Sequence, residues 1–191
     1  KLSIGLLWFP GPRATAYINI LKELDIAINV IVVMKNDKGN IKGLTQVAAT
    51  NNYSAQYFDV DYSLQQYVEE FGVRIVATSA THINDLTLSE IIFTEHVQDW
   101  IFCGGGILKP HLFSKGKRYI HVHPGKLPNF RGSTCFYYSI LHDLSLAYSA
   151  FYMSQKLDDG DNLAITEFNF NLRITEHMPL FFDYILDPWI R

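Results

Sequence analysis

Apolar residues along this chain follow two spacings, short continuous runs and stretches that repeat every three to four positions. The first continuous run covers residues 2–9 and is closed by the PGP turn at 10–12, which predicts a strand buried on both faces. Beyond the turn, Ala14, Tyr17, Leu21 and Leu24 follow the spacing of one face of a helix. The chain therefore begins as a strand that leads into a helix packed on a sheet.

The same alternation continues to the end of the chain. Further strands are predicted over 26–34, 73–78, 100–103, 119–123, 147–153 and 163–170, with a short one over 55–60. Further helices are predicted over 63–71, 88–96, 134–141 and 178–185, the last stopped by Asp187-Pro188, with a weak one over 44–52. Strands that alternate with helices indicate an α/β fold, an open, mostly parallel, twisted sheet flanked by helices and joined by right-handed crossovers.

Two histidines mark the end of the strand over 119–123. Strand side chains alternate between faces, so His121 and His123 share one face and Val122 lies on the other. Pro124 cannot donate to a sheet ladder, so the strand should stop at His123 and leave its imidazole on a rim. A single histidine is more often structural than catalytic, and the significance of this pair depends on what lies beside it.

Three loops follow predicted strands: the triple glycine at 104–106, the histidine turn, and residues 157–161. Ligands of open parallel sheets bind outside the carboxyl ends of the strands, so these loops should share a crevice. Glycines let a flat ligand approach the backbone, although they could also serve only a turn with positive φ. Asp158 in the last loop could be a surface turn residue, or it could raise the pKa of an imidazole and orient it. No phosphate-binding glycine motif is present.

Composition and charge narrow the class of partner. A net charge of −3 over 191 residues lacks the basic excess that phosphate backbones require, which argues against a nucleic-acid partner. No apolar run approaches the about 20 residues of a membrane span, and the first residues show no signal-peptide pattern. Cys103 and Cys135 are predicted to be buried thiols. We expect a cytoplasmic protein without membrane contact.

The combination of the histidine turn and the aspartate loop resembles a known family. Residues 123–132 (HPGKLPNFRG), followed by LDDGD at 157–161, are similar to the motifs of formyltransferases that use 10-formyltetrahydrofolate. These include glycinamide ribonucleotide transformylase, methionyl-tRNA formyltransferase and the sugar N-formyltransferases. The resemblance implies a Rossmann-like formyltransferase fold, with a catalytic domain over 1–175 and a C-terminal helix over 176–191 that could begin a further region.

The resemblance also implies roles for individual residues. His123 matches the catalytic histidine and Asp158 the catalytic aspartate, and the formyl donor would be 10-formyltetrahydrofolate. The cofactor would be held largely by backbone contacts, through Gly104, Gly105, Gly106, Ile107, Leu108 and Asp158.

The chain departs from the family pattern at two places. The family has an asparagine where this chain has His121, and the asparagine amide donates to the formyl oxygen as negative charge develops on it. Because a histidine can also donate, we expect His121 to take over that role. The second departure, Gly125-Lys126 in place of Ser-Leu, affects the expected acceptor more than the chemistry.

The leading interpretation is an enzyme of one-carbon metabolism. It would transfer a formyl group to a small-molecule amine, an amino sugar on a nucleotide carrier. His121 and His123 would stabilise the oxyanion and relay the proton, and Asp158 would orient and polarise His123. No metal takes part in this interpretation.

Two alternatives stay open. His121, His123 and Asp158 could supply two nitrogens and an oxygen to zinc in a metal-dependent hydrolase. Against this, the other five histidines form no metal-binding motif; they are His82, His96, His111, His142 and His177. The missing asparagine motivates the second alternative, a catalytically impaired relative that still binds folate.

Overall fold

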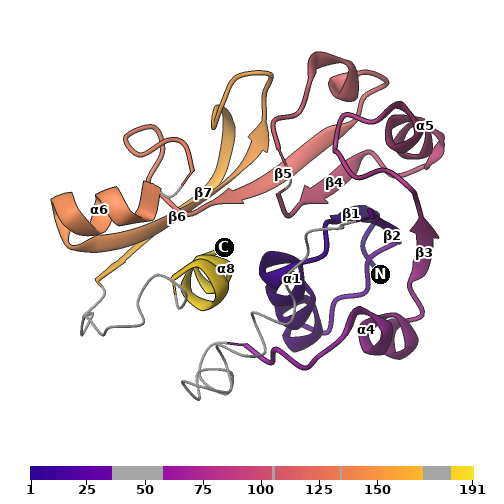
Figure 1. The fold of residues 1–191 in the computed structure, drawn as a ribbon, viewed down its shortest axis with the longest axis horizontal. Coiled ribbons are helices and arrows are strands. Elements are labelled where there is room, and N and C mark those ends of the chain that lie inside the picture. Colours follow the sequence, from indigo (N-terminus) through magenta and orange to yellow (C-terminus); the bar gives the residue numbers. More distant parts are fainter. Residues whose placement is uncertain (36–57, 105, 134, 170–181) are drawn as a thin grey trace.

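The computed structural model describes residues 1–35, 58–104, 106–133, 135–169 and 182–191, and shows one twisted sheet flanked by helices (Figure 1). The strands of the sheet are β1 (Ile4–Trp8), β2 (Val30–Val33), β3 (Arg74–Ala77), β4 (Asp99–Phe102), β5 (Arg118–His123), β6 (Ser145–Met153) and β7 (Gly160–Asn169). The α-helices are α1 (Pro12–Glu23), α4 (Leu64–Phe71), α5 (Leu86–Thr94), α6 (Cys135–Asp143) and α8 (Asp187–Ile190). A 3₁₀ turn, η1 (Pro110–Phe113), and a π turn, η2 (Phe182–Leu186), complete the described elements.

The strands lie in the order β3-β2-β1-β4-β5-β6-β7. Neighbouring strands from β3 to β5 are parallel, which confirms the predicted open, mostly parallel α/β sheet. The sequence did not show that β6 runs antiparallel to β5 and β7 antiparallel to β6. In this register His123 lies opposite Ser149 and Ile120 opposite Tyr152, so the carboxyl end of β6 lies beside the start of β5.

Apolar side chains cover both faces of the central strands. On one face Leu7 packs with Leu88 and Ile92 of α5. On the other face Leu6 packs with Ile18 of α1, in a cluster that also includes Tyr67 of α4. Successive residues of β1 thus point into different clusters, which explains why the strand reads as an uninterrupted apolar run.

Helix boundaries follow local capping chemistry. Helix α4 begins after Ser63, whose side chain and that of Gln66 bond reciprocally to the backbone, and it ends at Gly72 with φ +59. Helix α5 begins earlier than predicted, because Asp85 caps it by accepting from the N–H of Thr87, and it also ends earlier, at Thr94. The predicted helix over 44–52 and residues 55–57 of the predicted strand lie outside the described residues, and residues 58–60 are not a strand.

The C-terminal segment continues past the point where a stop was predicted. Asp187-Pro188 opens α8 instead of ending a helix, because a proline in the first turn needs no N–H donor. The predicted residues 178–181 lie outside the described residues. Ile190 packs with Leu146 of β6 and Phe136 of α6, so α8 is part of the core next to α1. The domain division at residue 175 stays a prediction.

Candidate functional site

The histidine turn is held in place by the neighbouring strand. Strand β5 ends at His123, where it was expected to end. The Ser149 hydroxyl on β6 donates to the carbonyl oxygen of Gly125 at 2.7 Å and accepts from the N–H of Leu127 at 3.0 Å. Because Ser149 is fully buried, the turn is tied to the rigid sheet and not left to solvent.

Gly125 has no space for a side chain. A Cβ atom at this position would lie 2.7 Å from Cys135 Sγ, 3.0 Å from the Phe130 carbonyl oxygen and 3.1 Å from His123 Nε2. Glycine at position 125, where the family has serine, therefore lets the backbone pack closely against the His123 imidazole.

His123 has a defined tautomer. Its Nε2 lies 2.7 Å from the carbonyl oxygen of Phe130, which can only accept, so Nε2 carries the hydrogen. The Cys135 thiol donates to Pro124 O and lies 3.1 Å from the same Nε2, so it packs against this edge of the ring. Burial lowers the pKa of His123, opposed by the charge of Asp158. The imidazole is thus neutral near pH 7, and Nδ1 can accept a proton.

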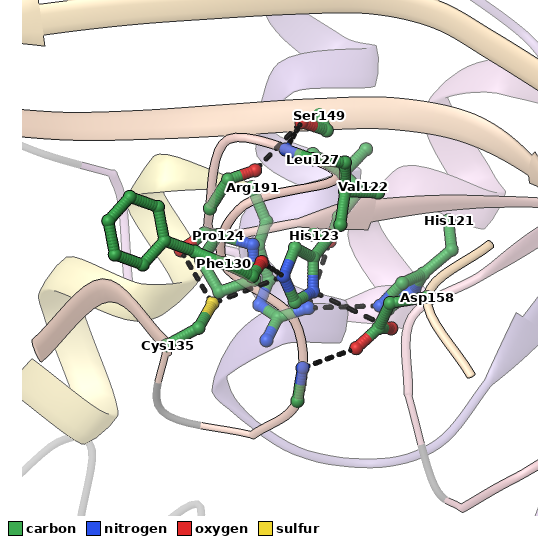
Figure 2. Close-up of polar contacts among 12 residues, drawn as sticks. His121, Val122, His123, Pro124, Leu127, Phe130, Cys135, Ser149, Asp158 and Arg191 are labelled. Carbon is green, nitrogen blue, oxygen red and sulfur yellow. Dashed lines mark hydrogen bonds and ion pairs between the residues drawn. The ribbon is translucent and has the colours of Figure 1, made fainter. Parts of the chain in front are cut away.

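Asp158 faces that acceptor nitrogen. Its Oδ1 lies 3.6 Å from His123 Nδ1, and its Oδ2 accepts from the N–H of Gly132 at 2.6 Å. Asp158 has φ +44, a backbone conformation that side-chain-bearing residues adopt uncommonly and that aspartate tolerates better than most. The carboxylate is placed to stabilise an imidazolium, and Figure 2 shows the pair at the turn.

The chain brings Asp158 next to His123 in a different way from the one predicted. Because β6 is antiparallel to β5, its carboxyl end is not at the edge where the parallel strands end, and the parallel-sheet argument for residues 157–161 was wrong. The loop is instead closed on itself, since Ser154 N–H donates to Asp159 O at 2.8 Å and the Ser154 hydroxyl bonds the Asp159 carboxylate. This compact loop carries Asp158 back to the end of β5.

His121 is buried and fully engaged. Its Nδ1 lies 2.9 Å from the carbonyl oxygen of Phe102, and its Nε2 lies 3.2 Å from Nη1 of Arg191. The carbonyl can only accept and the guanidinium can only donate, so Nδ1 bears the hydrogen and Nε2 the lone pair. Burial, with a further contribution from Arg191, lowers the pKa of His121 to about 3. This arrangement leaves His121 no N–H for a substrate, contrary to the expected donor role.

Three charged residues that the sequence analysis did not single out form a linked group beside His121: Arg13, Asp187 and Arg191. Asp187 accepts from Arg13 Nε at 2.7 Å through one oxygen and from Arg191 Nε at 3.0 Å through the other. Arg191 Nη1 also donates to the carbonyl oxygen of Val122 at 2.9 Å. The sequence signal was the spacing of Asp187 and Arg191 on a short helix, which is equally typical of a solvated helix end.

The glycine loop forms another wall of the crevice. Gly104 and Gly106 have φ of +112 and +118, so each meets a conformational need, and Gly105 lies outside the described residues. Ile107 is 64% exposed and its carbonyl accepts from Asn84, whereas Leu108 is buried in the core. The cofactor contacts expected of this loop stay a prediction.

One crevice collects the predicted loops. It is lined by Gly104, Gly106, Ile107, Leu108, His121, His123, Leu157 and Asp158, together with Arg13 and Arg191. The ranges described contain no group of three or more histidine, cysteine, aspartate or glutamate side chains that could hold a metal ion. None of the helices within those ranges is long and apolar enough to cross a membrane.

Comparison with known proteins extends this picture. No protein-family model matches the sequence, and no curated protein matches it. The fold matches phosphoribosylglycinamide formyltransferase from Anaplasma phagocytophilum with a TM-score of 0.63 at 16% identity, over 98% of this chain and 80% of that one. The same enzyme from Streptococcus pneumoniae matches with a TM-score of 0.60 at 13% identity, over 90% of this chain and 84% of that one.

A sugar formyltransferase shares the fold as well. WlaRD, a sugar 3N-formyl transferase whose structure was determined in the presence of dTDP and 5-N-formyl-THF, matches with a TM-score of 0.53 at 20% identity. That match covers 95% of this chain and 56% of WlaRD. The chain therefore has the α/β fold of the formyltransferases, as the resemblance implied.

Proposed function

We propose that this protein transfers a formyl group from 10-formyltetrahydrofolate to a primary amine. The observation that carries the proposal is the His123–Asp158 pair, with a 3.6 Å separation, at the crevice of a formyltransferase fold. The pair has the parts that acyl transfer to an amine requires, a neutral imidazole that accepts a proton and a carboxylate that stabilises the resulting cation.

The chain's residues would handle the proton in two steps. Nδ1 of His123 takes the proton that the amine loses as its nitrogen bonds the formyl carbon, and Asp158 stabilises the imidazolium that forms. His123 then returns that proton to N10 of the folate as the old carbon–nitrogen bond breaks. The products are a formamide and tetrahydrofolate, so atoms and protons balance. Buried Nε2–H, held by the Phe130 carbonyl, keeps the ring oriented throughout.

The glycine loop gives one wall of the crevice a surface against which a flat cofactor can lie. Gly104 and Gly106 present backbone without side chains to the crevice, and the exposed Ile107 offers an apolar contact. Leu108 supports the loop from the core, and Asn84 pins it by donating to Ile107 O and accepting from Lys109 N–H. We propose that these residues hold the folate, which supplies the activated formyl group.

For the acceptor we propose an amine on a nucleotide-linked sugar. The −3 net charge disfavours a tRNA acceptor, and the similar WlaRD structure was determined with dTDP. Glycinamide ribonucleotide is the second candidate, because this chain covers 80% of a matching phosphoribosylglycinamide formyltransferase but only 56% of WlaRD.

The two alternatives fare differently. A zinc site would need the lone pair of His121 Nε2, which instead accepts from Arg191, so the contacts do not favour the metal-dependent hydrolase. The impaired folate-binding relative is separated from the enzyme by turnover alone. Cys103 and Cys135 are buried free thiols, which supports a reducing compartment such as the cytoplasm.

The test is a direct assay with purified protein. We would supply 10-formyltetrahydrofolate with either a dTDP-linked amino sugar or glycinamide ribonucleotide, follow tetrahydrofolate release by absorbance and identify the formamide by mass spectrometry. His123→Ala should lower kcat about 10²-fold or more, whereas Arg74→Met, which breaks the ion pair with Glu95 away from the crevice, should not alter it. Absence of turnover with both acceptors, together with no stabilisation by a folate analogue, would refute the proposal.

A further inference from the structure

The guanidinium of Arg191 is held rigidly but not completely used. Its side chain is only 6% exposed, its Nε donates to Asp187, and its Nη1 donates to both Val122 O and His121 Nε2. These contacts account for Nε and Nη1, while Nη2 has no hydrogen-bond partner among the described residues. The buried guanidinium is therefore fixed through Nε and Nη1, and Nη2 keeps its hydrogens for another acceptor.

The crevice is where that donor group can act. Arg191 lines it together with His123, Asp158 and Gly104. Nη1 bonds the carbonyl of Val122, the residue between the two histidines, and Figure 2 shows the guanidinium beside both imidazoles. An atom that reacts at His123 therefore lies near this cation.

The local charge balance favours an anion. Asp187 is the carboxylate shared by Arg13 and Arg191, so these three side chains carry one net positive charge next to the crevice. The carboxylate of Asp158 is directed to His123 and Gly132 instead. Fixed positive charge where negative charge develops in a water-poor site is the arrangement that stabilises oxyanions.

From this geometry we propose that Arg191 is a catalytic residue that donates to the formyl oxygen as it becomes negative, and that His121 is a positioning residue that holds Arg191. The inference rests on the proposed formyl transfer. It explains why His121 can stand where the family's asparagine is expected: its N–H is bonded to Phe102 O, and its lone pair accepts from Arg191. The donor to the oxyanion is thus supplied by a different segment of the chain.

A purely structural arginine is the competing explanation, since the same contacts also tie α8 to β5. The two explanations differ in what they predict for kcat. A structural arginine affects folding and stability, whereas a donor to the oxyanion affects kcat with little change in KM for the folate, because the contact strengthens only in the transition state.

The first arm of the test removes the charge at similar volume. Arg191→Met should lower kcat about 10²-fold to 10³-fold, with KM for 10-formyltetrahydrofolate changed less than about threefold. Arg74→Met, which breaks the exposed ion pair with Glu95, is the matched control and should keep wild-type kcat. Arg191→Lys is the second variant should Arg191→Met not fold, and it should lose at least about tenfold in kcat, because a single ammonium cannot reproduce the planar fork. Arg191→Met or, if that does not fold, Arg191→Lys at the wild-type rate overturns the inference.

The second arm tests whether His121 acts through Arg191. His121→Phe should lower kcat, while His121→Gln, whose amide oxygen can replace the Nε2 lone pair, should recover much of it. In the Arg191→Met background, His121→Phe should cause no further loss, since the residue to be positioned is absent. Additive losses in this cycle would overturn the positioning role.

Chemical rescue separates a missing donor from a damaged fold. Millimolar guanidinium should restore part of the kcat of Arg191→Ala and leave Arg74→Ala unaffected, and absence of rescue in a folded Arg191→Ala would count against the donor role. A wild-type protein without formyl transfer to either acceptor would overturn the proposed function and this inference together. An active wild type with an equally active Arg191→Met would overturn this inference alone.

Discussion

Acidification should destabilise the folded protein through His121. Burial keeps this imidazole neutral in the folded state and lowers its pKa from 6.5 to about 3. In the unfolded chain the same group binds a proton once the pH falls below 6.5. Between these values only the unfolded state is protonated, so stability is complete above pH 6.5 and is lost progressively toward pH 3.

The size of the effect follows from the separation of the two pKa values. Each pH unit below 6.5 costs about 1.36 kcal/mol for one group, so at pH 5 the loss attributable to His121 is about 2 kcal/mol. The pKa of His123 is also lowered, so it adds a contribution of the same sign. The prediction therefore concerns the difference between wild type and a variant without the His121 imidazole.

Urea denaturation followed by tryptophan fluorescence at pH 7 and pH 5 measures this difference. The loss of unfolding free energy between the two pH values should be about 2 kcal/mol smaller in His121→Phe than in wild type, with His121→Gln as a second non-titrating variant. If both variants show the wild-type loss, His121 is protonated in the folded state at pH 5. The assignment of His121 as a neutral acceptor for the Arg191 guanidinium would then be wrong.

Three further predictions concern the site. Gly125→Ala should lower both kcat and the melting temperature, because the new Cβ would lie 2.7 Å from Cys135 Sγ. Adding Cys135→Ala should recover part of the loss, and equal stability of Gly125→Ala and wild type would contradict this packing. Asp158→Asn should move the acidic limb of kcat/KM to lower pH, since the Asp158 charge raises the pKa of His123, and an unmoved limb would show that the two do not interact. A folate analogue at about 100 times its Kd should stabilise the protein by about 2.7 kcal/mol in thermal unfolding, and an unchanged transition would contradict folate binding.

Much of the framework was predictable because it depends on neighbours in the sequence. The apolar run of β1 and the helical spacing of α1 each reflect burial of a local face. The end of β5 at His123 follows from Pro124, which cannot continue the ladder. The capping of α4 by Ser63 is likewise a local matter. Such features survive in almost any fold that buries the same faces.

Strand direction was not predictable in the same way. Parallel and antiparallel strands with buried faces have similar apolar patterns, so nothing in 147–153 indicated that β6 reverses. As a result, Asp158 was placed in the crevice by an argument that does not hold for an antiparallel strand. Its actual position depends on how the closed loop after β6 folds back, with a positive φ at Asp158 itself.

The sequence by itself determined the alternation of strands and helices and the end of β5 at His123. Tertiary structure alone decided which groups His121 contacts, because its partner Arg191 is 70 positions away along the chain. A charged pair such as Asp187 and Arg191 looks like a solvated helix end in the sequence. Only the packing of α8 beside α1 and β6 removes both side chains from water and places the guanidinium at the crevice.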